Sequence, residues 1–329
     1  MAIAGLCLAH GHVAAQLTAP QAASTDAARE ALGKQEGDVD QAALLKQTLT
    51  ASDKQYSLLK KGKWGATYDL TYTYIGQQEI DARFTDSELT LFKITNTRSH
   101  SITNTASVDY GLRDNLTANV TLPLVSKYSQ TTTYSSTLHG LGDVQAGLRW
   151  QPFELRRGAP SFTTSAGLRL PTGRSPFRTI QGQNLSTGSG TTGLTFGANS
   201  SKIIDPIALF GSVSVGVNFP ARHLGQIRDG VVLREVHPGP TLGFGGGFAY
   251  ALSYDVSTTF SFQQSLSFPT KLVFDGGATT RTNMQSSAMM NMGLGVRLSP
   301  QTTVNVTVGI GLTSDSPDFT LGMNMPLNF

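Results

Sequence analysis

The sequence has 329 residues, a formal net charge of +3 and only 14% charged residues, against about 25% in typical soluble domains. Such a sparse charge content excludes an ordinary soluble surface, and the small net charge without a dense Lys/Arg stripe excludes a nucleic-acid partner. Because no apolar run reaches about 18 residues, a helical membrane protein is also excluded. The class that remains is the transmembrane β-barrel, whose strands hide their apolar residues by alternation.

The first 37 residues are predicted to lie outside the folded domain. Residues 1–15 are apolar and end in small residues, which is typical of the remnant of a secretory signal without its basic start. A lipid-modified Cys7 is the alternative, although no apolar leader residue stands three positions before it. Residues 16–37 are rich in Ala, Gln, Thr and Ser, which predicts a periplasmic linker with too few apolar residues for a core.

Residues 38–63 have the pattern of one amphipathic helix. Its apolar positions recur at spacings of three, four or seven, lysines occupy other positions, and Gly62 is a stop signal. The apolar positions include Leu45, Leu49, Tyr56 and Leu59, and the lysines include Lys46 and Lys54. Because the helix is tethered directly to the first strand, we expect it to plug the lumen of a barrel. An oligomerising periplasmic helix and a helix docked on the rim are the alternatives.

Residues 64–329 alternate with a period of two. The first segment shows the pattern, with Tyr68, Leu70 and Tyr72 on one face and Asp69 and Thr71 on the other. Twelve such segments follow one another, which predicts an all-β fold, a 12-stranded antiparallel transmembrane β-barrel in the bacterial outer membrane. A soluble β-sandwich is the alternative, but its outer faces would carry charges that are missing here.

The predicted connections alternate in length. Long polar loops are expected at 76–98, 129–140, 172–191, 221–239 and 270–284, with short turns at the other end. An even strand count after the N-terminal helix places both termini in the periplasm. Aromatic residues form two expected girdles: Trp64, Tyr110, Trp150, Tyr250 and Phe329 at the short-turn rim, and Tyr74, Phe219, Phe268 and Phe319 at the other.

The inward face is predicted to be uniformly polar and to carry the functional residues. Its charged positions are Asp69, Asp109, Asp143, Arg149, Arg169 and Arg297. Ionised groups at membrane depth persist only when they pair or meet water. Two interpretations are open: a charged lining that selects what passes, and Asp/Arg pairs that brace the wall.

Nothing in the sequence indicates an enzyme. The six histidines have no metal-ligand spacing, and no metal site, cofactor or ATP site is predicted. Outer-membrane phospholipases are also 12-stranded barrels and would require a lipid-facing Ser and His. The alternation places no histidine on the outward face, so this activity is not expected.

Several motifs resemble known outer-membrane transporters. The runs at 140–144 (Gly-Leu-Gly-Asp-Val), 168–173 and 314–318 resemble the group that includes phenol-degradation pathway channels. The runs at 44–50, 56–60, 68–72, 186–190 and 250–255 are more specific, and are similar to the secretion pore of the functional amyloid (Fap) system. This resemblance implies a plugged 12-stranded barrel, a homotrimer joined by coiled coils, and export of unfolded amyloid subunits. Residues 16–37, however, show no sustained heptads.

From the sequence we therefore expect an outer-membrane pore that exports unfolded amyloid subunits and is gated by its N-terminal helix. Its expected partners are those subunits and the surrounding lipid and lipopolysaccharide. An uptake channel for small hydrophobic or aromatic compounds is the first alternative, and it would need an apolar lumen patch or a lateral opening. An autotransporter-like translocator is the second.

Overall fold

The computed structural model describes residues 58–329 apart from 86–87, 132–133, 157, 179–184, 205–206, 229–230, 254, 300–301 and 328–329. The predicted signal remnant, the linker and the helix positions Leu45, Lys46, Leu49, Lys54 and Tyr56 lie outside the described residues, as does Phe329. Among the described residues, no helix has the length and apolar character that would let it cross a bilayer.

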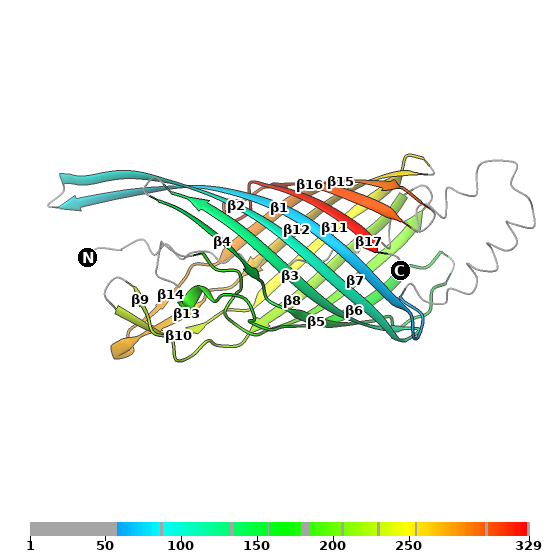
Figure 1. The fold of residues 1–329 in the computed structure, drawn as a ribbon, viewed down its shortest axis with the longest axis horizontal. Helices are drawn as coiled ribbons and strands as arrows, with labels where there is room; N and C mark the ends of the chain where they lie inside the picture. Colours follow the sequence, from blue (N-terminus) through cyan, green and yellow to red (C-terminus); the bar gives the residue numbers. More distant parts are fainter. Residues whose placement is uncertain are drawn as a thin grey trace, which may run out of the picture.

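The described chain forms a closed antiparallel sheet of tilted strands (Figure 1). Each wall strand except β4 pairs with a neighbour on both sides, and β17 returns to β1. β4 pairs with β3 alone and shares one ring position with β5, which also pairs with β3. The ring therefore has twelve positions, which confirms the predicted 12-stranded antiparallel barrel. In chain order the wall strands are β1 (Trp64–Thr85), β2 (Glu88–Arg113), β3 (Leu116–Gln130), β4 (Ser135–Leu141), β5 (Gln145–Trp150), β6 (Ser161–Arg169), β7 (Gly193–Ile204), β8 (Ile207–Asn218), β11 (Thr241–Ala251), β12 (Val256–Ser267), β15 (Gln285–Arg297), β16 (Thr303–Gly311) and β17 (Phe319–Leu327).

The alternation of the sequence decides which side chains face outward. On β8, Leu209, Val213 and Val215 are each nearly half exposed, while the intervening Ser214 is buried on the inner face. Apolar side chains on the outside of a closed sheet suit a lipid environment and would be costly to leave in water. Membrane insertion thus accounts for the apolar exterior of this barrel.

Aromatic residues gather at both ends of the wall. At the short-turn end the rings of Trp64 and Tyr110 lie 4.5 Å apart. At the long-loop end Tyr74 pairs with Phe319, the first residue of β17. Amphipathic rings at these positions are typical of the two membrane interfaces.

Four of the predicted long loops contain strands, so their description as loops was wrong. β1 and β2 continue through 76–98 as a two-stranded ribbon, and β4 occupies the second half of 129–140. The predicted loops at 221–239 and 270–284 meet in a second sheet, formed by β9 (Gln226–Arg228), β10 (Val231–His237), β13 (Lys271–Phe274) and β14 (Thr279–Arg281). Its core contains the buried Leu233, Val236 and Leu272, so these polar-looking segments fold by burying a few apolar residues against each other.

The described end of the predicted helix 38–63 is not helical. Residues 58–63 form a bend and a turn, and Gly62 has a φ of +75°, a left-handed conformation that favours glycine. Two short 3-10 helices, η1 (Pro176–Arg178) and η2 (Asp275–Gly277), are the helical segments of the described chain.

Candidate functional site: the inner wall and its interruption

The barrel wall is interrupted between β4 and β5. Residues 142–144 belong to no strand, although β3 pairs with β4 on one side of them and with β5 on the other. Pro123 of β3 lies opposite the interruption and has no N–H to donate, but its carbonyl accepts from Gly142 N at 2.8 Å. A Cβ on Gly142 would lie 3.0 Å from Pro123 Cγ and 3.2 Å from Val125 Cγ2. Pro123 and Gly142 therefore fix the place where the ladder breaks.

The two ends of the segment 172–191 fill this break. Thr172 Oγ1 donates to the carbonyl of Gly142 at 2.8 Å and accepts from Val144 N at 2.9 Å. Thr187 Oγ1 donates to the carbonyl of Leu141 at 2.7 Å. Threonine hydroxyls thus hold the carbonyls of Leu141 and Gly142 and the N–H of Val144, beside a backbone bond from Leu170 N to the carbonyl of Val144 at 2.9 Å.

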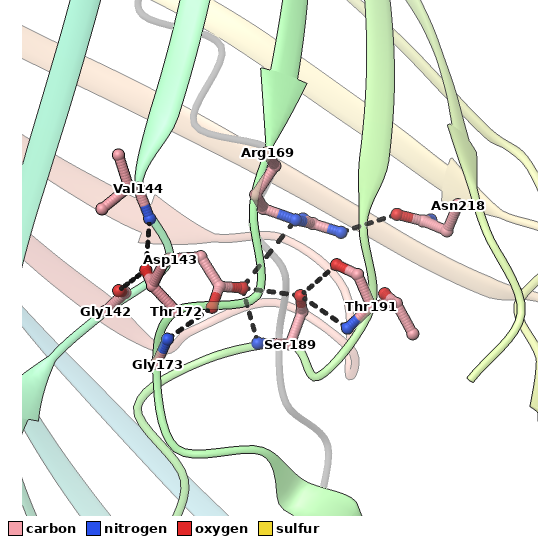
Figure 2. A network of polar contacts seen from close by, with 9 residues as sticks. All are labelled: Gly142, Asp143, Val144, Arg169, Thr172, Gly173, Ser189, Thr191 and Asn218. Carbon is pink, nitrogen blue, oxygen red and sulfur yellow. Dashed lines mark hydrogen bonds and ion pairs between the residues drawn. The ribbon is translucent and has the colours of Figure 1, made fainter. Parts of the chain in front are cut away.

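Asp143 is the centre of this patch (Figure 2). Its carboxylate accepts hydrogen bonds from Gly173 N at 3.1 Å, from Ser189 N at 2.7 Å and from Ser189 Oγ at 2.6 Å. A Cβ on Gly188 would lie 2.2 Å from Asp143 Oδ1, so the close approach of the loop requires glycine there. Asp143 is only 7% exposed, and a buried carboxylate of this kind depends on such donors.

Basic side chains surround Asp143 on the inner face. Arg169 Nε lies 3.9 Å from Asp143 Oδ2, and Arg169 Nη2 donates to Asn218 Oδ1 at 2.6 Å. Lys127 also interacts electrostatically with Asp143. The network spans the wall from β3 to β8 and compensates the buried negative charge.

The other predicted lumen residues lie in smaller groups. Asp109 and Arg149 form an ion pair between β2 and β5. The side-chain amide of Asn324 donates to Asp69, and Arg297 Nε donates to the carbonyl of Ser299 at 3.3 Å. The structure thus brings four of the six predicted residues into two acid–base pairs, Asp109–Arg149 and Asp143–Arg169.

The inner wall also carries an apolar patch where β8 and β11 reach the short-turn end, so the prediction of a uniformly polar wall was wrong. Ala208, Ala249 and Ala251 form a buried cluster on the inner face of β8 and β11. Next to them Phe210 also points inward, since a Cβ on the paired Gly247 would lie 2.8 Å from Phe210 Cζ. Small inward residues therefore form an apolar surface here.

The chain enters the barrel over its short-turn rim. Gly62 N donates to the carbonyl of Gly111 at 2.7 Å, and Gly111 N donates to the carbonyl of Lys63 at 3.0 Å. Leu59 Cδ1 lies 3.4 Å from the position of a Cβ on Gly65, and Gly65 and Gly111 both belong to the inward-facing set. The backbone at Leu59 and Lys60 therefore lies inside the mouth of the barrel.

Histidines do face outward, so the argument that excluded a phospholipase was wrong in its premise. Ser126 and His139 are paired on β3 and β4, with Ser126 Oγ 2.9 Å from His139 Nδ1. His100 faces outward on β2. Within the described part of the chain, the second ring nitrogen of His139 has no hydrogen-bond partner, so the group that would orient a catalytic histidine is missing there. The described residues also contain no group of three potential metal ligands.

Sequence reasoning missed several members of the network. Lys127 and Asn218 stand on the inward-facing positions of their strands, so the period of two could have identified them. Ser189 and Thr187 belong to the run at 186–190, which was used only as a resemblance. No local pattern indicates that this run folds back 46 residues to Asp143.

A known protein family and several solved structures are similar to this chain. A family model described as "Putative MetA-pathway of phenol degradation" matches residues 84–329. The chain is similar to the crystal structure of an outer-membrane channel from Pseudomonas putida F1, with 14% identity, a TM-score of 0.58 and coverage of 84% of this chain and 98% of that one. It is also similar to the transport unit of the autotransporter AIDA-I from Escherichia coli, with 11% identity, a TM-score of 0.49 and coverage of 86% and 97%. These likenesses concern the fold.

Proposed function

The chain belongs to the family described as the putative MetA pathway of phenol degradation, and from that membership and the geometry of its wall we propose that it is an outer-membrane uptake channel for small hydrophobic compounds. The observation that carries the proposal is the break in the wall at 142–144, which is closed by side chains of a loop instead of by a strand. This is the function that sequence reasoning ranked second, after amyloid export.

A lateral opening in the wall would let a hydrophobic solute pass directly from the lumen into the lipid. A solute that leaves a pore into water gains nothing from its apolar surface, whereas exit through the wall transfers that surface directly into lipid. The break is lined by apolar groups on both sides: Leu124 and Leu141 outside, Pro123 and Val125 inside. In this proposal the solute binds the apolar inner cluster of β8 and β11 before it leaves through the wall.

The N-terminal segment serves as a gate in this proposal, with both termini in the periplasm. Its support is the entry of the chain into the mouth at Leu59 and Lys60. The part of the proposed helix that precedes residue 58 would then lie in the lumen, with Leu45, Leu49 and Tyr56 on the apolar inner cluster. Lys46 and Lys54 would face the carboxylates on the opposite side.

Export of unfolded amyloid subunits is the second candidate. Its support is the resemblance of the runs at 44–50 and 56–60, together with the polar inner face of β1, β16 and β17, where Asp69, Asn305 and Asn324 lie. A homotrimer belongs to that candidate. An autotransporter-like translocator remains the third, and no observation favours it.

A reversible lock tests the proposed lateral route. A Cβ on Gly140 would lie 3.5 Å from Thr187 Cγ2, so Gly140→Cys with Thr187→Cys places two thiols at disulfide range. We expect the oxidised variant, with Cys7 replaced by Ser, to lose most uptake of a fluorescent hydrophobic naphthylamine into proteoliposomes. Reduction should restore the uptake, because it frees the loop from β4.

The matched control carries a disulfide between two strands that are already hydrogen-bonded to each other. Ser161 and Ser201 face each other on strands that are already paired, with their Oγ atoms 2.7 Å apart, so Ser161→Cys with Ser201→Cys should leave uptake unchanged. Equal uptake by locked and reduced proteins would overturn the lateral route. A deletion strain that loses surface amyloid and keeps growth on a hydrophobic carbon source would instead favour the second candidate.

A further inference from the structure

One sector of the lipid-facing surface differs in chemistry from the rest of the belt. On the outer face of β1–β3, the imidazole of His100 lies among three tyrosines. Its ring centroid is 5.1 Å from that of Tyr74, 6.0 Å from that of Tyr128 and 6.1 Å from that of Tyr72. Tyr72 Oη and His100 Nδ1 are hydrogen-bonded at 2.8 Å. The four rings form a preassembled polar aromatic surface.

Further polar groups extend this surface onto the neighbouring strands. The Ser126–His139 pair lies on β3 and β4, one step from Tyr128 along the outward face. Arg98 occupies the next outward position of β2 beyond His100 and is exposed. We call the set Arg98, His100, Tyr72, Tyr74, Tyr128, Ser126 and His139 the tyrosine–histidine facet.

The facet lies near the long-loop rim. Tyr128 is two residues from the end of β3, His139 pairs with Ser126 four positions from the β3–β4 turn, and Tyr74 pairs with the first residue of β17. Other strand ends at this rim present apolar residues to the outside, namely Phe219, Phe268 and Ile310, of which Ile310 is 57% exposed. The facet is therefore a local feature of the rim and is not required to close a barrel.

The chemistry of the facet suits one component of its surroundings. Aromatic rings with hydroxyl and imidazole groups can pack against a sugar and hydrogen-bond its hydroxyls, and a guanidinium binds phosphate oxygens in a fork. Outside the long-loop rim of an outer-membrane barrel, the lipid headgroup with both features is the phosphorylated glucosamine of lipopolysaccharide. Asp318 borders the facet, but its carboxylate accepts from Gly76 N at 2.7 Å at the end of β1.

We propose that the tyrosine–histidine facet binds the phosphorylated glucosamine headgroup of lipopolysaccharide. The tyrosine rings pack on the sugar, the imidazoles of His100 and His139 hydrogen-bond it, and Arg98 contacts a phosphate. The bound lipid lies on β3 and β4, the strands that border the wall break. The proposal does not depend on which solute the channel carries.

The test measures binding of purified lipid A to the refolded full chain in detergent. We expect His100→Leu with His139→Leu to weaken binding at least about tenfold, because each substitution removes a hydrogen-bonding ring and keeps a lipid-compatible side chain. The matched control, Phe219→Leu with Ile310→Leu, changes two outward residues at the same rim and should bind as the wild type does. The heat-dependent shift of the folded barrel on gels confirms that each variant has folded.

Two further arms separate the parts of the proposal. Dephosphorylated lipid A should bind the wild type more weakly than lipid A does, because Arg98 then has no phosphate to contact. For the same reason, Arg98→Gln should reduce the affinity for dephosphorylated lipid A less than it reduces the affinity for lipid A. Phosphatidylglycerol micelles should not compete at equal phosphate concentration. Unchanged lipid A binding by the double histidine variant would overturn the site, and equal competition by phosphatidylglycerol would overturn its recognition of the sugar.

Discussion

The two sides of the lumen are built in different ways. On β8 and β11, Ala208 and Ala249 face inward from a ladder that runs in unbroken register from Ile207 to Gly216. On β3 to β6 the ladder is broken, and Asp143, Arg169 and Lys127 face inward beside the gap. Strand pairing alone therefore joins β8 to β11, whereas side-chain hydrogen bonds supplement two backbone bonds at the gap.

This difference shows which side of the barrel is able to change. Opening a ladder of backbone hydrogen bonds leaves many N–H and C=O groups without partners, and lipid offers no replacement partners. The patch at 141–144 is held by two backbone bonds and a few side-chain bonds from Thr172, Thr187 and Asp143, which water inside the lumen could replace. We therefore assign the moving part of the channel to the charged side and the fixed part to the apolar side.

The largest expected effect follows from removing the carboxylate of Asp143. Asp143→Ala removes the acceptor of the Gly173 and Ser189 N–H groups and the carboxylate that pairs with Arg169. Breaking a buried pair costs about 3 to 5 kcal/mol, so the free energy of unfolding in urea should fall by about that amount, and single-channel recordings should show a less stable closed state.

Asp143→Asn is the matched control for that variant. It retains an oxygen that can accept from Gly173 or Ser189 but loses the charge, so its loss of stability should be smaller. Equal stability of the wild type and Asp143→Ala would refute the view that side chains close this part of the wall.

The sequence determined the wall of this barrel more completely than its loops. Alternation predicted the inward position of Asp143 and Arg169 because a strand sends successive side chains to opposite faces. It could not predict that Ser189 would meet Asp143, because that contact depends on how a loop folds back across 46 residues. The same limit explains the missed sheet of β10 and β13, where Leu233 and Leu272 meet only after two separate loops come together.

A methyl group added to the fixed side should have the next largest effect. A Cβ at Gly247 on β11 would lie 2.2 Å from the carbonyl oxygen of Phe260 and 2.8 Å from Phe210 Cζ, whereas at Gly167 on β6 the nearest atom is 3.9 Å away. Overpacking typically costs about 1 to 3 kcal/mol. We expect Gly247→Ala to lower the urea midpoint and the folded yield, and Gly167→Ala to change neither. A reversed order would show that the inner face of β11 at Gly247 has more room than that of β6 at Gly167.

A smaller effect is expected from the second acid–base pair. Arg149 is 42% exposed beside Asp109, so solvent screens this pair and its contribution to stability should be about 1 kcal/mol or less. Asp109→Asn should instead shift ion selectivity toward anions, because the positive charge of Arg149 then has no neighbouring carboxylate. The reversal potential under a salt gradient measures this shift, and an unchanged potential would show that the pair does not line the conducting path.

The smallest effect belongs to the pair that lies in water, Arg234 and Asp275 of the second sheet. Arg234 Nη2 donates to Asp275 Oδ2 at 3.2 Å, and this hydrogen bond and charge lower the pKa of Asp275. A carboxylate whose pKa is lower in the folded protein than in the unfolded chain stabilises the fold at pH values above its unfolded pKa of about 3.9. That stabilisation is lost as the pH falls through the lower folded-state pKa. Asp275→Asn should therefore lower the thermal midpoint slightly at pH 7 and low salt, and match the wild type near pH 2 or in about 1 M salt, where screening is nearly complete. If the difference in thermal midpoint between the wild type and Asp275→Asn grew in acid, Asp275 would be stabilised in its protonated form. The contrast between exposed and lumenal ion pairs would then be wrong.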